Sequence, residues 1–407
     1  MAQRTIAGID VGTTKTCTLV GELDDGDNLR IVGVGVVPSR GIRRGMIVNV
    51  TEATEAIVAS VERAERISGH KIDSAVVGIG GGHISSVNSK GVIAISRGPK
   101  GITDEDVERS LDGARAIAIP HNREIIHSIA RGFSIDGQDG VKDPVGMQAF
   151  RLEVEAHIVT GASPSINNLV KCVESAGLTI DNLVLQPLAS GLAVLTEEER
   201  EMGVVLADIG GGTTDVAIFI EGSIWHTIIL SNGGNHITND IAVGLQMPFA
   251  TAEEIKIRYG HAQPDAIQGA DEIDVAAFGE AARQAVSREF LSEIIQARAE
   301  EIFNMILTEV KRSGYDGLLP AGIVLCGGAA GLPGIAELGR KILHMPVRVG
   351  APHDLEGLVD ILGSPAYATS VGLLIWGLKE HPTRVSAPMG SGLMERMWKW
   401  LRTLLPG

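Results

Sequence analysis

Two short segments, about half a chain apart, contain residue types suited to binding phosphate. The first is GIDVGTTKTCTLV, from Gly8, and the second is GVVLADIGGGTTDVAIFI, from Gly203. Each has an Asp at the end of an apolar strand, then a glycine turn, a Thr-Thr pair and a second strand. Glycines let backbone N–H groups approach phosphate oxygens, and threonine hydroxyls add donors. Because the pattern occurs twice, it predicts two phosphate loops rather than two ordinary β-turns.

The residues expected to hold a nucleotide lie in these loops and just before them. They are Asp10, Gly12, Thr13, Thr14 and Lys15 in the first loop, and Asp208, Gly210, Gly211, Gly212, Thr213 and Thr214 in the second. Asp10 and Asp208 can each hold the water shell of a Mg²⁺ ion that neutralises the phosphates. We expect the Lys15 ammonium to contact the β- and γ-phosphates.

Such a repeat predicts two like-folded domains that face each other across a cleft. The chain has 407 residues, 44% of them hydrophobic, which is enough for two or more cores. Its net charge of −15 argues against a nucleic-acid-binding body. The N-terminus MAQRTIAGID has no signal-peptide pattern, and no apolar run is long enough to span a bilayer, so a cytosolic body is expected.

Other cofactor sites find little support in the sequence. Cys17, Cys172 and Cys326 stand far apart in apolar surroundings, which is typical of reduced, buried thiols rather than zinc ligands. No G-x-x-x-x-G-K-[ST] run occurs, and VVGIGGGHISSV lacks the third glycine of a dinucleotide fingerprint because His83 stands there. We interpret Gly78 to Gly82 as a tight structural crossing.

A third glycine-rich segment, GIVLCGGAAGLPGIAEL, contains Gly327, Gly328 and Ala329. The three segments together resemble the actin, Hsp70 and sugar-kinase ATPase superfamily, in the order first phosphate loop, second phosphate loop and adenosine loop. LVLQPLASGLAVL is similar to the first connecting helix of that superfamily, with Gln186 at the place of its water-orienting Gln. SPAYATSVGLLIWGL resembles the second connecting helix. The resemblance implies an actin-like α/β fold that binds ATP and Mg²⁺.

Within that superfamily the chain resembles the FtsA family of cell-division proteins, from Thr5 to Leu405. RGIRRGMIVNVTEATEAI is similar to the segment after the family's first sheet, and NSKGVIAISRGPKGITDEDVERSLDGARAIAIPHNREIIHSI with PVGMQAFRLEVEAHIVTG to its inserted subdomain. GGNHITNDIAVGL and TAEEIKIRYG resemble its adenosine-contacting segments. The resemblance places Gly233 and Gly234 close to the nucleotide. It makes Glu253 and Lys256, three positions apart on one helix face, contacts of the ribose or adenine.

The resemblance also implies a division into subdomains. The expected ranges are 1–83 and 161–198 for subdomain 1A, with 361–381 packed on it; 84–160 for the inserted subdomain 1C; 199–243 and 303–360 for 2A; 244–302 for 2B; 382–390 for a linker; and 391–407 for a terminal helix. In the insert, the period-2 strands GVIAI and RLEVEAHIV surround a helix that Thr103 would cap.

SREFLSEIIQARAEEIFNMILTEVKRSG has the period of an amphipathic helix. Its expected core positions are Leu291, Ile294, Ile295, Ile302, Met305 and Ile306. Arg288 and Arg298 would lie on the exposed side. Because FtsA-like proteins bind the acidic and apolar C-terminal peptide of FtsZ at this subdomain, the resemblance makes these arginines candidate partners of that peptide.

The last segment, after LKEHPTRVSAPMGSG, predicts an amphipathic helix. At about 100° per residue, one arc of roughly 160° holds the apolar side chains. They are Leu393, Met394, Met397, Trp398, Trp400, Leu401, Leu404 and Leu405, while Glu395, Arg396, Lys399, Arg402 and Thr403 fill the other side. Tryptophans beside an apolar wedge with a basic flank are typical of an interfacial membrane helix. Docking on the protein's own core, or in a partner's groove, is the alternative.

Together with the predicted terminal helix, the resemblance to the FtsA family implies an ATP-binding, actin-like protein that assembles into filaments on the cytoplasmic face of the membrane at the division site. The FtsA resemblance implies FtsZ as a partner and later division proteins as partners of the insert. Hydrolysis through Gln186 is expected to be weak, and ATP to serve assembly. The alternatives are a membrane scaffold of another system, such as pilus assembly, or a small-molecule kinase. A kinase needs a carboxylate base beyond the two metal-binding aspartates.

Overall fold

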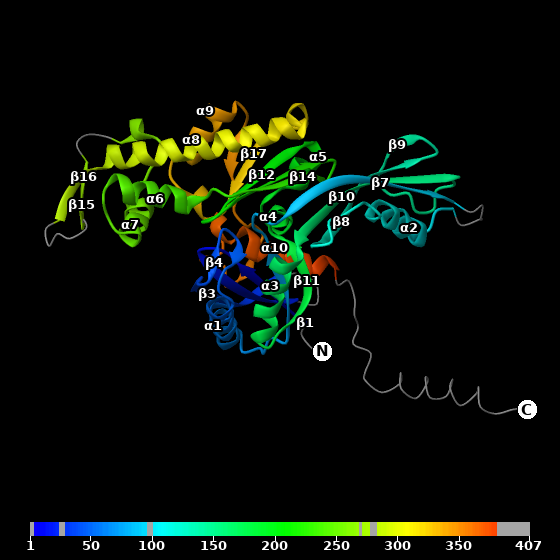
Figure 1. Cartoon of the computed structure of the whole chain (residues 1–407), viewed down its shortest axis with the longest axis horizontal. Helices are drawn as coiled ribbons and strands as arrows, with labels where there is room; N and C mark the ends of the chain where they lie inside the picture. The colour runs from blue at the N-terminus through cyan, green and yellow to red at the C-terminus, as the bar shows by residue number, and fades with distance from the viewer. Residues whose placement is uncertain (1–3, 24–28, 96–100, 268–270, 277–282, 381–407) are drawn as a thin grey trace, which may run out of the picture.

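The computed structural model describes the chain except for residues 1–3, 24–28, 96–100, 268–270, 277–282 and 381–407. The predicted terminal helix therefore lies outside the described residues. In Figure 1 the molecule has a crossbar and a stem. The stem holds the N-terminal sheet, the middle of the crossbar holds a second sheet, and the two arms are a helical subdomain and a small sheet with one helix.

The two central sheets confirm the repeat that the loops predicted. The first has the order β11-β6-β1-β2-β3-β19 and the second β14-β13-β12-β17-β18. The strands of the first are β1 (Arg4–Val11), β2 (Lys15–Leu23), β3 (Leu29–Pro38), β6 (Ser74–Ile79), β11 (Thr179–Leu185) and β19 (Glu356–Gly357). Those of the second are β12 (Val204–Ile209), β13 (Thr214–Ile220), β14 (Ser223–Leu230), β17 (Ile323–Cys326) and β18 (Val347–Val349).

Each sheet is built in the same way. Three strands form an antiparallel meander, and the first strand of the meander also pairs in parallel with a later strand, β6 in one sheet and β17 in the other. The two hairpins have matching registers, with Val11 opposite Thr16 and Ile209 opposite Thr214. Each phosphate loop is consequently the turn of the first hairpin of its sheet.

Two helices join the halves between the sheets. They are α4 (Gln186–Val194) and α10 (Ala368–Glu380), the helices expected from the two connecting segments. Gly372 of α10 lies so close to α4 that a Cβ there would be 1.8 Å from the Ala189 carbonyl oxygen. This crossing holds the beginning of α10 against both phosphate-loop strands, where its first polar side chains enter the cleft.

Helices cover the outer faces of the sheets and build one arm. α1 (Val50–Ser68) and α3 (Ser163–Ser175) lie on the first sheet, and α8 (Arg288–Ser313) and α9 (Ile335–Leu343) on the second. α6 (Gly234–Gly244), α7 (Phe249–Tyr259) and the hairpin of β15 (Glu272–Ala276) and β16 (Arg283–Ser287) form the arm beyond α8. α8 buries Leu291, Ile295, Ile302 and Ile306 as predicted, with Ile294 and Met305 half-buried.

The other arm is the insert. Its sheet has the order β7-β10-β8-β9, formed by β7 (Ser85–Ala94), β10 (Arg151–Ala162), β8 (Arg123–Ile135) and β9 (Gln138–Val141). α2 (Asp104–Arg115) packs on this sheet, and Thr103 forms the predicted cap, reinforced by Asp106 in a capping box. The subdomain boundaries themselves stay predictions.

The glycine run from Gly78 to Gly82 is a tight crossing, as predicted. A Cβ on Gly80 would lie 2.0 Å from Gln186 Oε1, and one on Gly81 would lie 2.7 Å from the Gly45 carbonyl oxygen. Gly81 also has a φ of +101°, which an L side chain rarely adopts. The run therefore brings the first sheet against the loop of β4 (Ile42–Arg43) and β5 (Met46–Ile47) and against α4.

Candidate nucleotide-binding site

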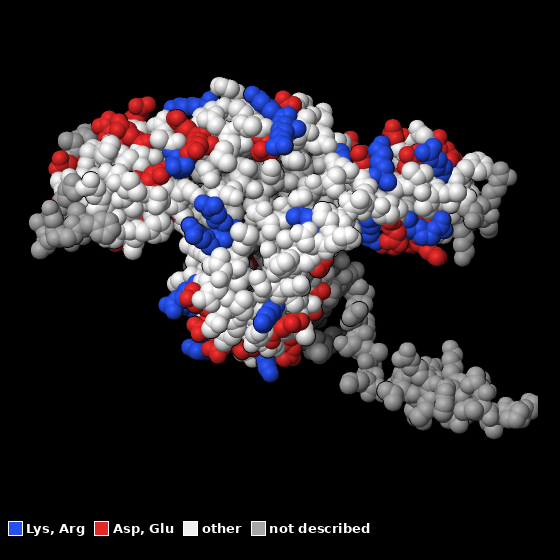
Figure 2. Space-filling model, in the orientation of Figure 1, with Lys and Arg blue, Asp and Glu red and all other residues white. Residues whose placement is uncertain are grey.

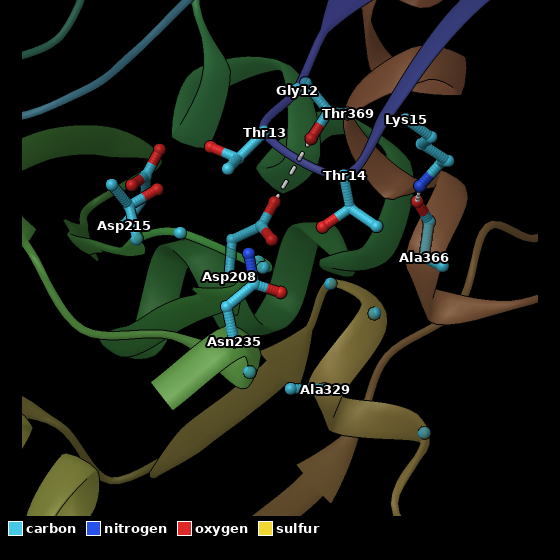
Figure 3. Close-up of a pocket in the computed structure, with 18 of the residues that line it drawn as sticks. Gly12, Thr13, Thr14, Lys15, Asp208, Asp215, Asn235, Ala329, Ala366 and Thr369 are labelled. Atoms are coloured by element: carbon cyan, nitrogen blue, oxygen red, sulfur yellow. Dashed lines mark hydrogen bonds between the residues drawn. The ribbon is translucent and has the colours of Figure 1, made fainter. Parts of the chain in front are cut away.

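A cavity of about 350 Å³ lies between the two sheets, at the turns of both first hairpins. Figure 3 shows residues from both phosphate loops, α6, α10 and the Gly327 turn pointing into it. The predicted residues that line it are Asp10, Gly12, Thr13, Thr14, Lys15, Gln186, Asp208, Gly210, Gly211, Gly212, Thr213, Gly234, Glu253, Lys256, Gly327, Gly328 and Ala329. The two halves of the chain thus bring nearly all of the predicted residues to one cavity.

Two predicted residues, Thr214 and Gly233, are not among those that line the cavity. Thr214 begins β13, is fully buried, and its hydroxyl donates to the Asn232 carbonyl oxygen at 2.7 Å. Gly233 packs against the second loop, where a Cβ would be 2.6 Å from the Gly210 carbonyl oxygen. Both residues therefore pack beside the second loop without lining the cavity.

The two phosphate loops touch each other across the cavity. A Cβ on Gly211 would lie 2.0 Å from Thr14 Oγ1, and a Cβ on Gly212 would lie 2.6 Å from Thr13 Oγ1. Thr13 Oγ1 also accepts a hydrogen bond from the backbone N–H of Gly45 at 3.0 Å. The glycine turns and the threonine hydroxyls of the two loops are therefore in direct contact at one place in the cavity, and such groups are suited to binding phosphate.

The loop aspartates are held by donors from the connecting helices. Asp10 accepts from Gln186 Nε2 at 3.1 Å and from the Ser370 hydroxyl at 3.0 Å. Asp208 accepts from the Ser190 hydroxyl at 2.7 Å and from that of Thr369 at 3.1 Å, a bond drawn in Figure 3. The beginning of α10 is thereby bonded to both aspartates.

A third carboxylate, Asp215, lines the same cavity and was missed by the sequence reading. It is 4% exposed, and its Oδ1 has no hydrogen-bond partner among the described residues. Burial, followed by repulsion from Asp208, raises its pKa to about 8. The sequence does indicate Asp215 as a candidate site residue, because it follows the Thr-Thr pair of the second loop as Lys15 follows that of the first.

The cavity suits Mg²⁺ held through water. Burial is the largest effect on the pKa of Asp10 and raises it; Lys15 lowers this pKa in part, and the like charge of Asp208 raises it. A divalent cation would relieve that repulsion and satisfy the unpaired oxygen of Asp215. No group of three or more His, Cys, Asp or Glu in the described part of the chain is close enough to hold a metal directly.

Lys15 does not point at the loops in this structure. Its ammonium donates a hydrogen bond to the Ala366 carbonyl oxygen and lies 4.7 Å from the centre of the Tyr367 ring. Figure 3 shows the side chain extended toward the turn just before α10. Lys15 still lines the cavity, and its contact with a phosphate stays a prediction.

The predicted ribose and adenine contacts form one connected cluster. Lys256 Nζ lies 2.7 Å from Glu253 Oε2, 2.8 Å from Thr238 Oγ1 and 3.3 Å from the Gly234 carbonyl oxygen. Apolar side chains of Ile237, Ile257, Leu332 and Pro333 line the same end of the cavity. A charged, hydrogen-bonding edge beside an apolar wall is suited to a ribose and a purine.

The arginines proposed for a partner peptide are both occupied. Arg298 bonds Asp240 of α6 through Nε at 2.5 Å and Nη2 at 3.0 Å, and also contacts Glu301. Arg288 donates to the Tyr259 carbonyl oxygen and to Asp271, each at 2.9 Å. Both are half-buried rather than fully exposed, because acidic side chains of neighbouring elements pair with them. Asp240 and Asp271 lie too far along the chain for helix periodicity to reveal them, whereas Glu301 lies only three residues after Arg298 in the same helix.

Comparison with known proteins decides the family. The chain is 42% identical to the cell division protein FtsA of Pseudomonas aeruginosa, over 98% of this chain and 97% of that protein. It is 35% identical to FtsA of Escherichia coli, over 98% of each chain. The chain belongs to the FtsA family of cell-division proteins.

Family models agree with this placement. The model described as "Cell division protein FtsA" matches residues 205–372, and that of the "SHS2 domain inserted in FTSA" matches residues 81–160. The second match covers the sheet of β7, β10, β8 and β9, so that sheet is the SHS2 insert. In this FtsA family member the insert lies on the opposite side of the second sheet from α6 and α7 (Figure 1).

Solved structures show the actin-like fold. A PilM–PilN type IV pilus biogenesis complex matches with a TM-score of 0.66 at 14% identity, over 92% of this chain and 98% of that chain. MreB5 of Spiroplasma citri bound to ADP matches with a TM-score of 0.53 at 15% identity, over 93% of this chain and 96% of that chain. These likenesses concern the fold alone. The identity to FtsA proteins therefore favours cell division over the pilus and kinase alternatives.

The state of the cysteines and the length of the apolar helices can also be compared with the sequence. Cys17, Cys172 and Cys326 are free and buried, as expected. No described helix combines the length and the apolar character needed to cross a bilayer. Figure 2 shows acidic and basic side chains interspersed on both arms and on the stem, with basic side chains where the stem meets the crossbar.

Proposed function

We propose that this FtsA family member binds ATP with Mg²⁺, assembles into filaments on the cytoplasmic face of the membrane at the division site, and tethers FtsZ there. The observation that carries the proposal is the cavity lined by both phosphate loops and the Gly327 turn. Two structures with TM-scores above 0.5, both of MreB5, were solved with ADP and with AMPPNP. A nucleotide in the corresponding cavity is the simplest use of this geometry.

Different residues would bind different parts of the nucleotide. The N–H groups around Gly12 and Gly211 would bind the phosphates, and Asp10 and Asp208 would hold the waters of Mg²⁺. When bound, Mg²⁺ would supply charge neutralisation of the phosphates. Glu253 and Lys256 would bind the ribose at the other end. Gln186 would orient a water for slow hydrolysis, since its amide already lies on Asp10.

ATP serves assembly in this proposal. Each of the two central sheets contributes one phosphate loop. A bound nucleotide would therefore be held by both halves of the chain and would favour their closed arrangement. A filament surface that spans both halves would then form only in the ATP state. Binding is required for this role, and rapid turnover is not.

The terminal segment supplies the membrane attachment. Partial burial of its eight apolar side chains would contribute on the order of 8–12 kcal/mol. Ordering the segment costs roughly 1 kcal/mol per residue before helix hydrogen bonds return part of it. One tail would thus bind weakly, whereas a row of tails on one filament would gain avidity of about 10²–10⁴. Filament formation and attachment to anionic lipid are coupled for this reason.

FtsZ would bind through its C-terminal peptide at the arm of α6, α7 and α8. Arg298 and Arg288 are the proposed partners of its acidic side chains. An incoming carboxylate would have to displace Asp240 or Asp271, because these already pair with the arginines. The SHS2 insert is the proposed surface for later division proteins.

Binding of a fluorescent ATP analogue with Mg²⁺ to the full chain tests the nucleotide site. Lys15→Met should weaken binding about 10- to 100-fold, because a hydrogen bond to a charged group contributes roughly 1.5–3 kcal/mol. Lys71→Met is the matched control, since that lysine is 82% exposed and remote from the cavity. Equal affinity of the two variants would contradict the assignment of Lys15.

A further inference from the structure

A second hollow, separate from the nucleotide cavity, lies where the SHS2 insert joins the first sheet. It has a volume of about 920 Å³ and is bounded by the beginning of β8, by β11, by α3 and by Trp376 of α10. We call it the β8–β11 groove. The residues that line it include Glu124, Ile125, Ser128, Glu174, Asp181 and Trp376.

Two strand edges flank the groove. Among the described strands, β11 is an edge strand that pairs with β6 alone, and the first half of β8 pairs with β10 alone. Two buried polar atoms in the groove, Ser128 Oγ and Trp376 Nε1, have no hydrogen-bond partner within the described ranges. These two atoms are buried beneath the hollow, so it is the strand edges beside it that indicate a surface which another segment can cover.

The groove has an apolar floor and an acidic rim. Isoleucine, valine and leucine side chains from β8, α3 and β11 form the floor. Glu124, Glu174 and Asp181 lie exposed at the rim, and none of the lining residues is Lys or Arg. The occupant should therefore present an apolar face flanked by positive charge.

The chain itself carries such a segment, and it starts beside the groove. Trp376 lines the groove, and α10 ends one turn later at Glu380. The predicted amphipathic helix around Leu393 to Leu405 follows a linker whose end-to-end distance is roughly 18 Å for a flexible chain. Its polar side bears Arg396, Lys399 and Arg402, opposite in sign to the rim. The place where this segment begins, its apolar face and its positive charge therefore all suit the groove.

We propose that, away from a membrane, the terminal segment docks its apolar face in the β8–β11 groove of the same chain. The functional consequence of this docking rests on the proposed membrane role. Because a docked tail cannot insert into lipid, the groove would keep the unassembled protein off the membrane. A tail that is docked nine-tenths of the time lowers the apparent affinity for lipid about tenfold. α10 joins the groove to the cleft, because Thr369 and Ser370 at its start bond Asp208 and Asp10.

Cysteine cross-linking in the full chain, without lipid, tests the docking. Ile125→Cys with Leu401→Cys should form an intramolecular disulfide at least tenfold faster than Ile67→Cys with Leu401→Cys. Ile125 and Ile67 are 36% and 49% exposed, and Ile67 lies on α1, outside the groove. The native cysteines are buried, and burial raises the pKa of their thiols, so they oxidise slowly. Equal rates, or disulfides only between two chains, would overturn the proposal.

Lipid binding by charge variants tests whether a docked tail keeps the protein off the membrane. Glu174→Lys with Asp181→Lys should lower the lipid concentration for half-saturation up to tenfold, because the rim no longer holds the basic tail. Glu55→Lys with Glu62→Lys makes the same charge change on exposed positions of α1 and should do much less. If both pairs shift lipid binding equally, the groove does not hold the tail. If no variant binds lipid while the Ile125→Cys disulfide forms, docking stands and the proposed membrane role fails.

Discussion

Gly327 offers a direct test of how the adenosine turn is packed on the second phosphate loop. It has a φ of +85°, and a Cβ there would be 2.4 Å from Asp208 Oδ1 and 2.6 Å from the Ile209 carbonyl oxygen. A non-glycine residue in this conformation costs roughly 1–2 kcal/mol. Moving backbone and a buried carboxylate away costs about 1–3 kcal/mol more. We expect Gly327→Ala to reduce the free energy of unfolding by about 2–5 kcal/mol.

Gly328→Ala is the matched control, because it lies in the same turn and its Cβ would meet nothing within 4 Å. Its effect on unfolding in the absence of nucleotide should stay within about 0.5 kcal/mol. Urea unfolding of both variants, with and without Mg-ATP, measures the difference. Gly327→Ala should also lose most of the stabilisation that ATP gives, because Asp208 is displaced. If the two variants unfold at the same urea concentration, this turn is not packed on Asp208 as described.

Three further predictions concern charges. Asp215, with a folded pKa of about 8, binds a proton that the unfolded chain releases near pH 4, so wild-type stability without nucleotide should fall as pH rises toward 8. Asp215→Asn should remove that fall, a gain of up to about 4 kcal/mol between pH 5 and 8 in urea unfolding. His157 is buried and neutral, with a pKa lowered to about 3, so stability should fall as pH drops below 6.5; His157→Gln should flatten this slope by up to about 2 kcal/mol between pH 6.5 and 5. Arg298→Ala should weaken binding of the FtsZ C-terminal peptide about tenfold in fluorescence anisotropy, while the exposed-site variant Arg312→Ala should not.

Local sequence patterns predicted a large part of the fold and of the candidate site. The two hairpins, the α8 core positions and the Thr103 cap follow from glycine turns, helix periodicity and capping chemistry, all of which act over a few residues. The halves of the nucleotide site were predictable because the pattern occurs twice. Their meeting at Thr14 and Gly211 follows from the closure of one cleft between two like sheets.

Contacts between distant segments could not be read from such patterns. Ser370 bonds Asp10 across 360 positions and Lys15 bonds Ala366 across 351, and both contacts depend on how α10 crosses α4. Asp215 was overlooked although it follows the second Thr-Thr pair, because its burial beside two other carboxylates emerges only in the folded chain. The pairing of Arg298 with Asp240 likewise depends on the packing of α6 on α8.

Co-sedimentation with liposomes that contain anionic lipid tests the central proposal most directly. The full chain would be compared with a version that ends at Ser391, each with and without Mg-ATP. The proposal predicts that ATP increases pelleting of the full chain and that truncation abolishes it, because only a filament of tails holds lipid firmly. If the full chain stays in the supernatant with ATP, or if the truncated chain pellets equally well, nucleotide-driven attachment through the tail is wrong.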